Sequence, residues 1–338
     1  VFRTILSDMK TCFFALLCFL PLLPLQAQHD AQREAVKAVA RADDTAYAKA
    51  FVNPKVDAGE HETIMTQILL LLSRDEVDDA IVAARGGLES GLPPERLLAG
   101  SGPLLGALRE HPEFSELPGI SEVGAIIHGP MLGDVTGRGA RIWVRTNGPL
   151  TLQAVTVDSR GTLRRTEERS STAETDYTLE FELEGLLPED RYEVFIVREE
   201  DPPEKAVARV SIETPVEKGE SSVFTVAFGG GAGFVPEFHR MWKTISAREP
   251  DALLMLGDNV YFYDPEHVLT QRYCYHRRQS EPNWRSLVSK TPVYAIYDDH
   301  DFGDNDCMPG PKIDEPAWKR PVVDFFSHNW ANPGYGGG

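Results

Sequence analysis

The sequence predicts a multidomain chain in which an α-helical N-terminal region precedes an all-β sandwich and then a layered α/β region. Three observations lead to this prediction. Apolar residues recur with a helical period between residues 31 and 116, the period changes to two between 120 and 214, and apolar strand patterns alternate with helical ones after 222. The length of 338 residues fits two or three domains that each bury a core.

Residues 1–27 have the pattern of a secretory signal peptide that begins at Met9. A basic start precedes an apolar stretch at 13–25, which is shorter than the roughly 20 residues of a membrane span. Ala27 offers a small residue at a cleavage point. An uncleaved amphipathic anchor is the alternative, which two prolines in the stretch disfavour. We therefore expect a secreted or periplasmic protein with no stable membrane anchor after signal cleavage.

Composition limits the classes of partner. Lys and Arg number 34 against 52 Asp and Glu, which gives a net charge of −18. No block of basic residues is present, so a nucleic-acid-binding surface is not expected, and a cation is the more natural ligand. Signal cleavage would leave Cys274 and Cys307, whose count is compatible with one disulfide or with two unpaired thiols.

We expect residues 28–118 to be helical, because apolar stripes of helical period occur at 31–39, 64–72 and 77–84. The pair Gly86-Gly87 and residues 91–94 are predicted to end the third helix. A helix-turn-helix repeat array is an alternative, but no fixed period supports it. A small bundle or an oligomerisation element is the favoured interpretation, and we assign no chemistry to this region.

Residues 119–215 carry short β-rich runs separated by turns, without intervening helices, which predicts an antiparallel sandwich. Tyr192 opens a strand just after a turn that contains Pro188. That is the position of a tyrosine corner, so we expect a fibronectin-III-like module. Such modules usually bind or space rather than catalyse. Residues 216–222 are predicted to be a linker.

Residues 223–338 alternate strand and helix patterns. Three apolar runs predict buried strands, and helical stretches separate them, which indicates a parallel sheet with crossover connections. In sheets of this kind the chemistry lies beyond the carboxyl ends of the strands. The predicted strands are 223–228, 252–256 and 292–297, and the helical stretches are 236–248 and 265–290.

Unusual segments follow all three predicted strands. A glycine run occupies 229–233, Asp258 follows the second strand, and residues 298–306 hold five carboxylates within nine residues. Two like charges 4 Å apart repel by about 1 kcal/mol in water and about 4 kcal/mol at an effective dielectric constant of 20. Converging several acids therefore requires a cation, and a hard metal bound through oxygen is the direct solution. Asp258 and Asp299 could bridge two ions, and His300 could donate a proton to the reacting group.

Other interpretations explain these segments less well. A solvated acidic loop explains the aspartates but not their position after apolar strands. An EF-hand fails because it needs a Gly at its sixth position and a Glu at its twelfth. A phosphate-cradling glycine loop is weakly supported, because the third spaced glycine of a dinucleotide turn is absent and no Gly-Lys-Ser/Thr follows. The remaining histidines of this part of the chain show no metal-ligand spacing and stay unassigned: His239, His267, His276 and His328.

Two acidic motifs carry a resemblance to a known family. The segments Gly257-Asp258-Asn259-Val260-Tyr261 and 297–306 resemble the paired signature of alkaline phosphatase D (PhoD-like) proteins within the calcineurin-like metallophosphoesterases. Residues 128–134 and 140–145 are similar to the opening strands of the N-terminal domain of that family. The resemblance covers about residues 124–338.

The resemblance implies hydrolysis of phosphate monoesters or diesters by a metal-activated water at a two-metal centre. The implied metals are calcium and iron, with manganese or zinc as further options, and the implied partner is a phosphate ester. The implied roles are a bridging ligand for Asp258, a phenolate ligand for Tyr261 and a ligand to the second ion for Asp299. His300 would be the catalytic group near the leaving oxygen. Asp298, Asp301 and Asn305 would be neighbours that support the ligands, and Asn305 is also a candidate metal residue.

The sequence departs from the family at two places. Gly231 stands where many members have the Cys that binds iron, so an iron–thiolate site is not carried over. The family fold also has a second half with further ligands, so we expect this chain to hold the first half of the metallophosphoesterase domain and to be inactive alone. The alternative function is a non-catalytic secreted binding module whose acidic loop binds calcium. A phospholipase-like or nuclease-like diesterase on the same site is a third possibility.

Overall fold

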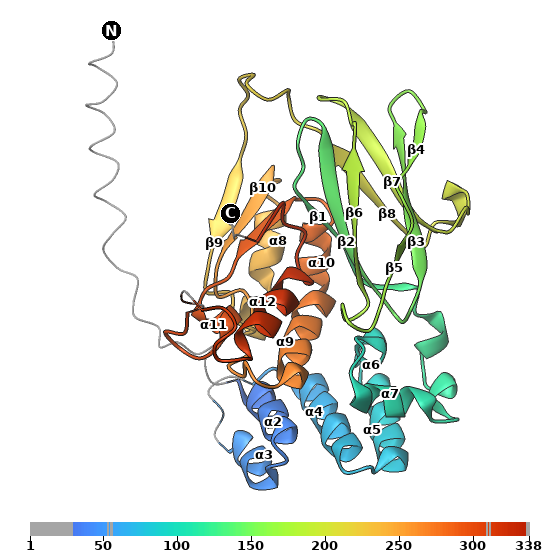
Figure 1. Cartoon of the computed structure of the whole chain (residues 1–338). Coiled ribbons are helices and arrows are strands. Elements are labelled where there is room, and N and C mark those ends of the chain that lie inside the picture. Colours follow the sequence, from blue (N-terminus) through green and yellow to red (C-terminus); the bar gives the residue numbers. More distant parts are fainter. Residues whose placement is uncertain (1–29, 53, 55–56, 309, 311, 336–338) are drawn as a thin grey trace, which may run out of the picture.

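The computed structural model describes residues 30–52, 54, 57–308, 310 and 312–335, in which helices are combined with antiparallel sheets and one small parallel sheet (Figure 1). The predicted signal peptide at 1–27 lies outside the described residues. Across the described ranges, no helix combines the length and the apolar character that crossing a membrane requires.

The N-terminal region is helical, as predicted. Helix α2 begins after Asp30, whose side chain accepts a hydrogen bond from the Arg33 backbone N–H at 3.1 Å. The predicted helix end is wrong for Gly86-Gly87, because helix α5 continues to Glu89, and it is confirmed for residues 91–94, which directly follow the C-cap Ser90. A Cβ on Gly87 would lie 2.8 Å from Ile64 Cγ2, so the glycine allows two helices to pack closely. The elements are α2 (Ala31–Ala40), α3 (Asp44–Ala50), α4 (Glu60–Ser73), α5 (Val77–Glu89), α6 (Glu95–Leu98), α7 (Pro103–Glu110), η2 (Phe114–Glu116) and η3 (Ile120–Glu122).

The middle of the chain forms two antiparallel sheets, with strand orders β1-β2-β6 and β4-β3-β7-β8, and β5 also pairs with β3. Side chains from both sheets, such as Ile142, Phe181 and Val194, form one hydrophobic cluster between them. The antiparallel sandwich predicted from the period of two is therefore confirmed. The strands are β1 (Ile126–Gly133), β2 (Gly139–Thr146), β3 (Thr151–Asp158), β4 (Leu163–Arg165), β5 (Arg169–Ser170), β6 (Thr178–Glu184), β7 (Arg191–Arg198) and β8 (Ala208–Glu213).

The predicted tyrosine corner is present. Tyr192 is buried at the start of β7, and its hydroxyl accepts a hydrogen bond from the Leu187 backbone N–H at 2.8 Å. The contact ties the turn between β6 and β7 to the sandwich core. A polar hydroxyl that satisfies a backbone donor five residues earlier explains why a tyrosine occupies this buried position.

The C-terminal part contains a parallel sheet of order β11-β10-β9, with β10 hydrogen-bonded to both neighbours. The parallel sheet and its helical crossovers are therefore confirmed, although β9 begins three residues later than expected. The 3-10 helix η5 (Pro236–Phe238) lies in the first crossover. The other elements are β9 (Val226–Gly229), α8 (Arg240–Ser246), β10 (Ala252–Leu256), α9 (Val268–Ser280), α10 (Pro282–Val288), β11 (Val293–Ile296), α11 (Asp299–Phe302) and α12 (Lys319–Ser327).

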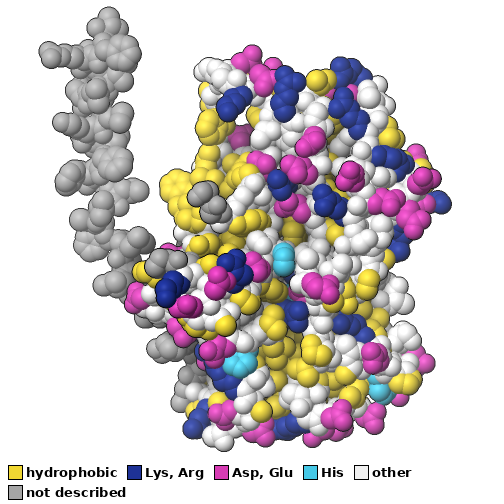
Figure 2. All heavy atoms as spheres, in the orientation of Figure 1, with side chains coloured by type: hydrophobic (Ala, Val, Ile, Leu, Met, Phe, Trp, Pro, Cys, Tyr) yellow, Lys and Arg dark blue, Asp and Glu magenta, His cyan; other side chains and the backbone are white. Residues whose placement is uncertain are grey.

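Only one face of the parallel sheet is buried, so the predicted buried strands are covered on one side. Leu253 and Met255 of β10 point into the core with the helices. On the other face, Phe228, Leu256 and Ile296 are 72%, 46% and 59% exposed. Figure 2 shows hydrophobic side chains gathered on the side of the molecule where β9 and β10 lie. A continuous run of apolar residues in the sequence of a strand does not show whether one face of the sheet or both faces are buried.

The helical region and the parallel sheet share one hydrophobic core. Ile68 of α4, Leu97 of α6, Trp284 of α10 and Met255 of β10 belong to the same cluster of buried side chains. Helix α2 packs directly on α9. The region predicted as a separate helical bundle is thus continuous in its packing with the α/β part, and it lies close to the segment that follows β10.

A cluster of buried charges joins the sandwich to α9, and we call it the junction cluster. Asp176, in the turn before β6, lies 3.2 Å from Arg145 Nη2, 2.9 Å from Arg272 Nε and 2.7 Å from His276 Nε2. Its Oδ1 also accepts a hydrogen bond from the Ser101 backbone N–H at 2.9 Å. Burial alone would raise the pKa of Asp176, but these cationic and hydrogen-bonding partners hold it well below its usual value.

Both cysteines of the C-terminal part are unpaired. Cys274 is buried in α9 and Cys307 is half-buried in the segment after α11, and neither forms a disulfide. Of the two alternatives that the cysteine count allowed, the structure has two free thiols. The C-terminal part is therefore held together by packing and hydrogen bonds.

Candidate metal centre

The segment after β10 brings Asp258 to the edge of the parallel sheet. Gly257 has φ of +95°, a conformation that favours glycine, and a Cβ at this position would lie 2.6 Å from Asp298 Cβ. Glycine is therefore required for the segments after β10 and β11 to approach each other. This approach places Asp258 opposite Asp299, at the carboxyl ends of two adjacent parallel strands.

The acidic segment after β11 folds into a short helix with a capping box. Asp298 is the N-cap of α11, and its carboxylate accepts a hydrogen bond from the Asp299 backbone N–H at 2.9 Å. Asp301 is buried and accepts hydrogen bonds from the backbone N–H groups of Asn259 and Val260 at 2.9 and 2.7 Å. Burial raises the pKa of Asp301 to about 7, against the opposing effect of these donors. The buried Asp301 carboxylate thus joins the segment after β11 to the segment after β10.

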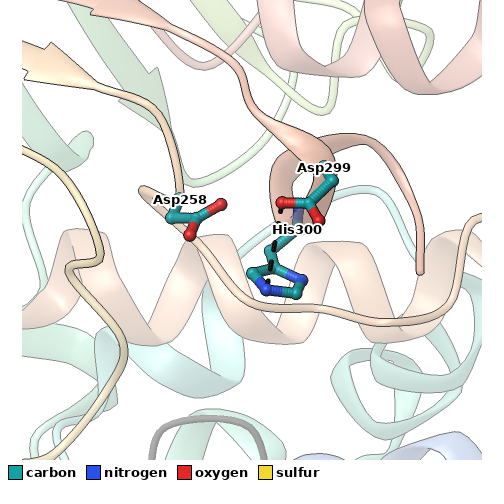
Figure 3. A group of neighbouring side chains, drawn as sticks. All are labelled: Asp258, Asp299 and His300. Carbon is teal, nitrogen blue, oxygen red and sulfur yellow. Dashed lines mark hydrogen bonds and ion pairs between the residues drawn. The ribbon is translucent and has the colours of Figure 1, made fainter. Parts of the chain in front are cut away.

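Asp258, Asp299 and His300 converge on one point. One potential ligand atom from each residue lies within 4.8 Å of the others (Figure 3). Asp258 projects from the segment after β10, while Asp299 and His300 project toward it from the first turn of α11. We call these three residues the sheet-edge cluster. Two carboxylates and one imidazole are ligands that a divalent cation accepts.

The charge of the sheet-edge cluster is not balanced by lysine or arginine. Within the described part of the chain, no Lys or Arg forms an ion pair with Asp258 or Asp299, and His300 Nε2 lies 3.9 Å from Asp299 Oδ1. Asp258 Oδ1 is buried and has no hydrogen-bond partner among the described residues. Burial raises the pKa of Asp258, and the neighbouring carboxylates of Asp299 and Asp298 raise it further. An orphaned buried oxygen beside a second carboxylate fits a cation.

Tyr261 contacts two members of the cluster. Its hydroxyl donates a hydrogen bond to Asp258 Oδ2 at 3.0 Å, and its ring lies 4.7 Å from the His300 ring. Burial and the charge of Asp258 raise the pKa of Tyr261, so the phenol is the neutral donor in this arrangement. The role of a phenolate ligand, expected from the resemblance, stays a prediction that requires a cation to favour loss of the proton.

Asn305 lies on the exposed part of the acidic segment. Its side-chain amide donates a hydrogen bond to Asp306 Oδ2 at 2.6 Å. The segment folds back toward the cluster, because the Asp306 backbone N–H donates to Asp299 Oδ2 at 2.5 Å. The role of Asn305 as a metal ligand stays a prediction, because the hydrogen bond occupies its amide nitrogen and not the amide oxygen that would bind a metal.

The glycine run after β9 borders the same site. The backbone N–H groups of Gly231 and Ala232 donate to the carbonyl oxygens of Gly257 and Asp258 at 3.3 and 2.9 Å. A Cβ on Gly231 would lie 3.6 Å from the Tyr261 hydroxyl. All three strand-end segments therefore meet at one edge of the sheet, and Gly231 lies beside Tyr261.

Sequence reasoning missed Tyr263. Its hydroxyl lies 3.2 Å from His300 Nε2, and its ring lies 4.6 Å from the His300 ring. Burial raises the pKa of Tyr263. The available signal was the position of Tyr263 two residues after Tyr261, in the segment that carries Asp258.

Comparisons with known proteins give weak resemblances. No family model matches the chain, and no curated protein matches it. A solved structure of PhoD is similar with a TM-score of 0.48 and 14% identity over 60% of this chain and 45% of that one, so this chain spans less than half of the PhoD chain. The sensor domain of the anti-sigma factor RsgI4 of Pseudobacteroides cellulosolvens gives a TM-score of 0.24 with 10% identity, over 30% of this chain and 82% of that one. The fn3 domain of human collagen alpha-1(XX) chain gives a TM-score of 0.20 with 15% identity, over 30% and 89%.

Proposed function

We propose that this protein is a metal-dependent phosphoester hydrolase and that the sheet-edge cluster is part of its cation site. The observation that carries the proposal is the convergence of Asp258, Asp299 and His300 within 4.8 Å, where no lysine or arginine of the described residues forms an ion pair with either carboxylate. Ionised carboxylates that face each other at partly buried positions repel strongly unless a cation lies between them.

Two further features support the same assignment. The cluster lies beyond the carboxyl ends of adjacent parallel strands, where open α/β sheets hold their ligands. Its residues belong to the two sequence motifs that resemble the PhoD-like family, namely 257–261 and 297–306. A dinuclear centre takes more ligands than three, so the cluster accounts for part of such a centre.

The residues divide into holding and proton-transfer roles. Asp258 and Asp299 would hold the cation, with Tyr261 and Asn305 as further ligands, and His300 would donate a proton to the leaving oxygen. A bound cation would neutralise charge on the phosphoryl group and lower the pKa of water. Asp301 would keep the two ligand-bearing segments at their observed spacing through its backbone hydrogen bonds.

The remaining assignments follow the same proposal. The substrate is a phosphate monoester or diester, and the metals to test first are calcium, iron, manganese and zinc. Export to the periplasm or the medium belongs to the proposal through the signal-peptide pattern at 1–27.

The test measures hydrolysis of p-nitrophenyl phosphate and bis-p-nitrophenyl phosphate by the product of the complete gene, with each metal supplied in turn. We expect Asp258→Asn to abolish metal-dependent hydrolysis. Asp304→Asn is the matched control, because Asp304 is an exposed aspartate of the same acidic segment that lies outside the sheet-edge cluster. Its hydrolysis is expected to equal that of the wild type.

The possible results separate the functions. Hydrolysis that needs metal and Asp258 supports the hydrolase, and the ratio of the two substrate rates distinguishes a monoesterase from a diesterase. Metal binding without hydrolysis of either ester overturns the enzyme and favours the non-catalytic calcium-binding module. The absence of both metal binding and hydrolysis overturns the cation site as well.

A further inference from the structure

Helix α2, to which the sequence assigned no chemistry, lies against the segment that carries the candidate site. Arg33 of this helix is 1% exposed. Its Nη1 donates a hydrogen bond to the Tyr261 carbonyl oxygen at 3.0 Å, and its guanidinium carbon lies 4.6 Å from the centre of the Tyr263 ring. One side chain from the N-terminal region therefore contacts both tyrosines of the site, one through its backbone and one through its ring face.

The helix is fixed on this segment at both ends. At its N-terminal end, Asp30 accepts a hydrogen bond from Arg277 of α9, and both side chains are buried. At its C-terminal end, Arg41 Nη2 lies 2.9 Å from Asp264 Oδ1, whose carboxylate also accepts a hydrogen bond from the Thr270 hydroxyl at 2.7 Å. Arg33 lies between these two anchors.

The backbone of Tyr263 gives a reason for this support. Tyr263 has φ of +50°, in the left-handed region that bulky residues rarely adopt, so the surrounding contacts must hold it there. The result of that conformation is the contact between the Tyr263 hydroxyl and His300 Nε2 at 3.2 Å. The His300 ring contacts both tyrosine rings, at 4.7 and 4.6 Å from the ring centres of Tyr261 and Tyr263, which are themselves 6.0 Å apart.

We propose that Arg33 is a positioning residue of the site, which acts through Tyr263 to fix the orientation of the His300 imidazole. The inference rests on the proposed function for its consequence in hydrolysis, while the geometric link from Arg33 to His300 stands independently. Groups that orient a metal-binding or proton-donating histidine through its ring nitrogen typically change metal affinity or activity by about 10-fold to 100-fold when they are removed. The N-terminal helical region thus has a part in the site through one arginine.

The first experiment observes the His300 ring nitrogens by NMR of the full chain labelled with ¹⁵N-histidine. We expect Arg33→Met and Tyr263→Phe each to shift the His300 Nε2 resonance, and the double variant to shift it no further than Tyr263→Phe alone. Arg33→Lys should restore part of the wild-type position, because it keeps a cation beside the ring. Arg41→Met is the matched control, since it removes an arginine of the same helix that contacts the same segment at Asp264 and not Tyr263.

The second experiment measures Mn²⁺ affinity by electron paramagnetic resonance. Arg33→Met and Arg41→Met are both expected to keep wild-type Mn²⁺ affinity, because His300 is the proposed proton donor and not one of the proposed ligands. In the product of the complete gene, Arg33→Met should lower kcat and leave KM for the ester unchanged. Far-UV circular dichroism and the denaturant midpoint show that each variant is folded.

The outcomes separate the two proposals. A folded Arg33→Met variant with a wild-type His300 resonance overturns the positioning role, as does an additive effect in the double variant. If no variant and no wild type binds Mn²⁺, the proposed function fails, yet the His300 resonance still decides whether Arg33 orients the imidazole.

Discussion

In both the junction cluster and the sheet-edge cluster an aspartate faces a histidine, but the charges around the two aspartates are opposite. Asp176 faces His276 and is surrounded by two arginines and a backbone donor, which lower its pKa although it is buried. Asp258 faces His300, has one hydroxyl donor and a neighbouring carboxylate, and has a raised pKa. Burial acts in the same direction on both groups, so the difference comes from the partners.

The comparison distinguishes a structural group from a candidate ligand. A buried carboxylate whose partners all belong to the chain, such as Asp176, holds secondary-structure elements together. Removing the carboxylate leaves its buried cationic partners unpaired. A carboxylate with an orphaned oxygen and an acidic neighbour leaves the chain with a charge that an external cation must balance. Residue type alone would not separate Asp176 from Asp258.

The largest expected effect is at the junction cluster. Asp176→Asn leaves Arg145, Arg272 and His276 without their shared anion inside the protein. We expect the free energy of unfolding to fall by about 3–5 kcal/mol, measured by urea denaturation in the absence of metal. A loss below about 1 kcal/mol would show that the junction cluster does not hold the sandwich to α9.

The junction cluster also predicts acid sensitivity. Burial and the charge of Arg145 lower the pKa of His276 from 6.5 to about 4, against the opposing effect of Asp176, and His128 lies beside it at a ring distance of 5.8 Å. Between pH 6.5 and 4 the unfolded chain binds the proton and the folded one does not, so stability falls as pH is lowered through this window. The loss from this group is on the order of 3 kcal/mol.

The measurement compares unfolding free energies of the wild type and His276→Gln at a series of pH values. The variant should have a shallower slope between pH 6.5 and 4, because one titrating group is removed. Equal slopes of unfolding free energy against pH would mean that the pKa of His276 is not lowered in the folded protein.

The sheet-edge cluster depends on a close approach of backbone. Gly257→Ala places a Cβ at 2.6 Å from Asp298 Cβ on a residue with φ of +95°, which we expect to cost about 1–3 kcal/mol of stability and to weaken Mn²⁺ binding. Gly229→Ala is the control, because a Cβ there meets no atom within 4 Å. Urea unfolding measures the stability of each variant, and Mn²⁺ titration measures its metal binding. Equal behaviour of the two variants would contradict the role of Gly257 in bringing the carboxylates together.

The smallest stability effect is expected from Asp258→Asn without metal. Since the folded protein disfavours the ionised form of Asp258, replacing it by an amide should leave the free energy of unfolding within about 1 kcal/mol of the wild type, or raise it slightly. Urea unfolding of metal-free protein tests this. A large loss of unfolding free energy would mean that Asp258, like Asp176, is a structural group.

Much of the architecture could be predicted from local pattern. The change of period from helical to alternating located the sandwich, and the turn before Tyr192 predicted the hydroxyl contact to Leu187. Exposure of one sheet face was not predictable, because Phe228 and Leu256 have the same apolar character as the buried Leu253. The helix through Gly86-Gly87 was missed because packing on α4 outweighs glycine propensity.

The candidate site could be predicted in part. Asp258 and Asp299 follow parallel strands, and that position in the chain is enough to bring them to one edge. Arg33 could not be predicted as a neighbour, because it is more than 200 residues from Tyr261 in sequence and no local pattern encodes that contact. Asp301 resembled a ligand in sequence, but its backbone donors make it a structural tie.

The most direct test of the cation site is the stabilisation of the folded chain by Mn²⁺. A ligand that binds only the folded state at 100 times its Kd adds about 2.7 kcal/mol to the free energy of unfolding. We predict that gain for the wild type and for Asp304→Asn, and its loss in Asp258→Asn and Asp299→Asn. An equal gain in Asp258→Asn, or no gain in the wild type with any of the four metals, would contradict the account.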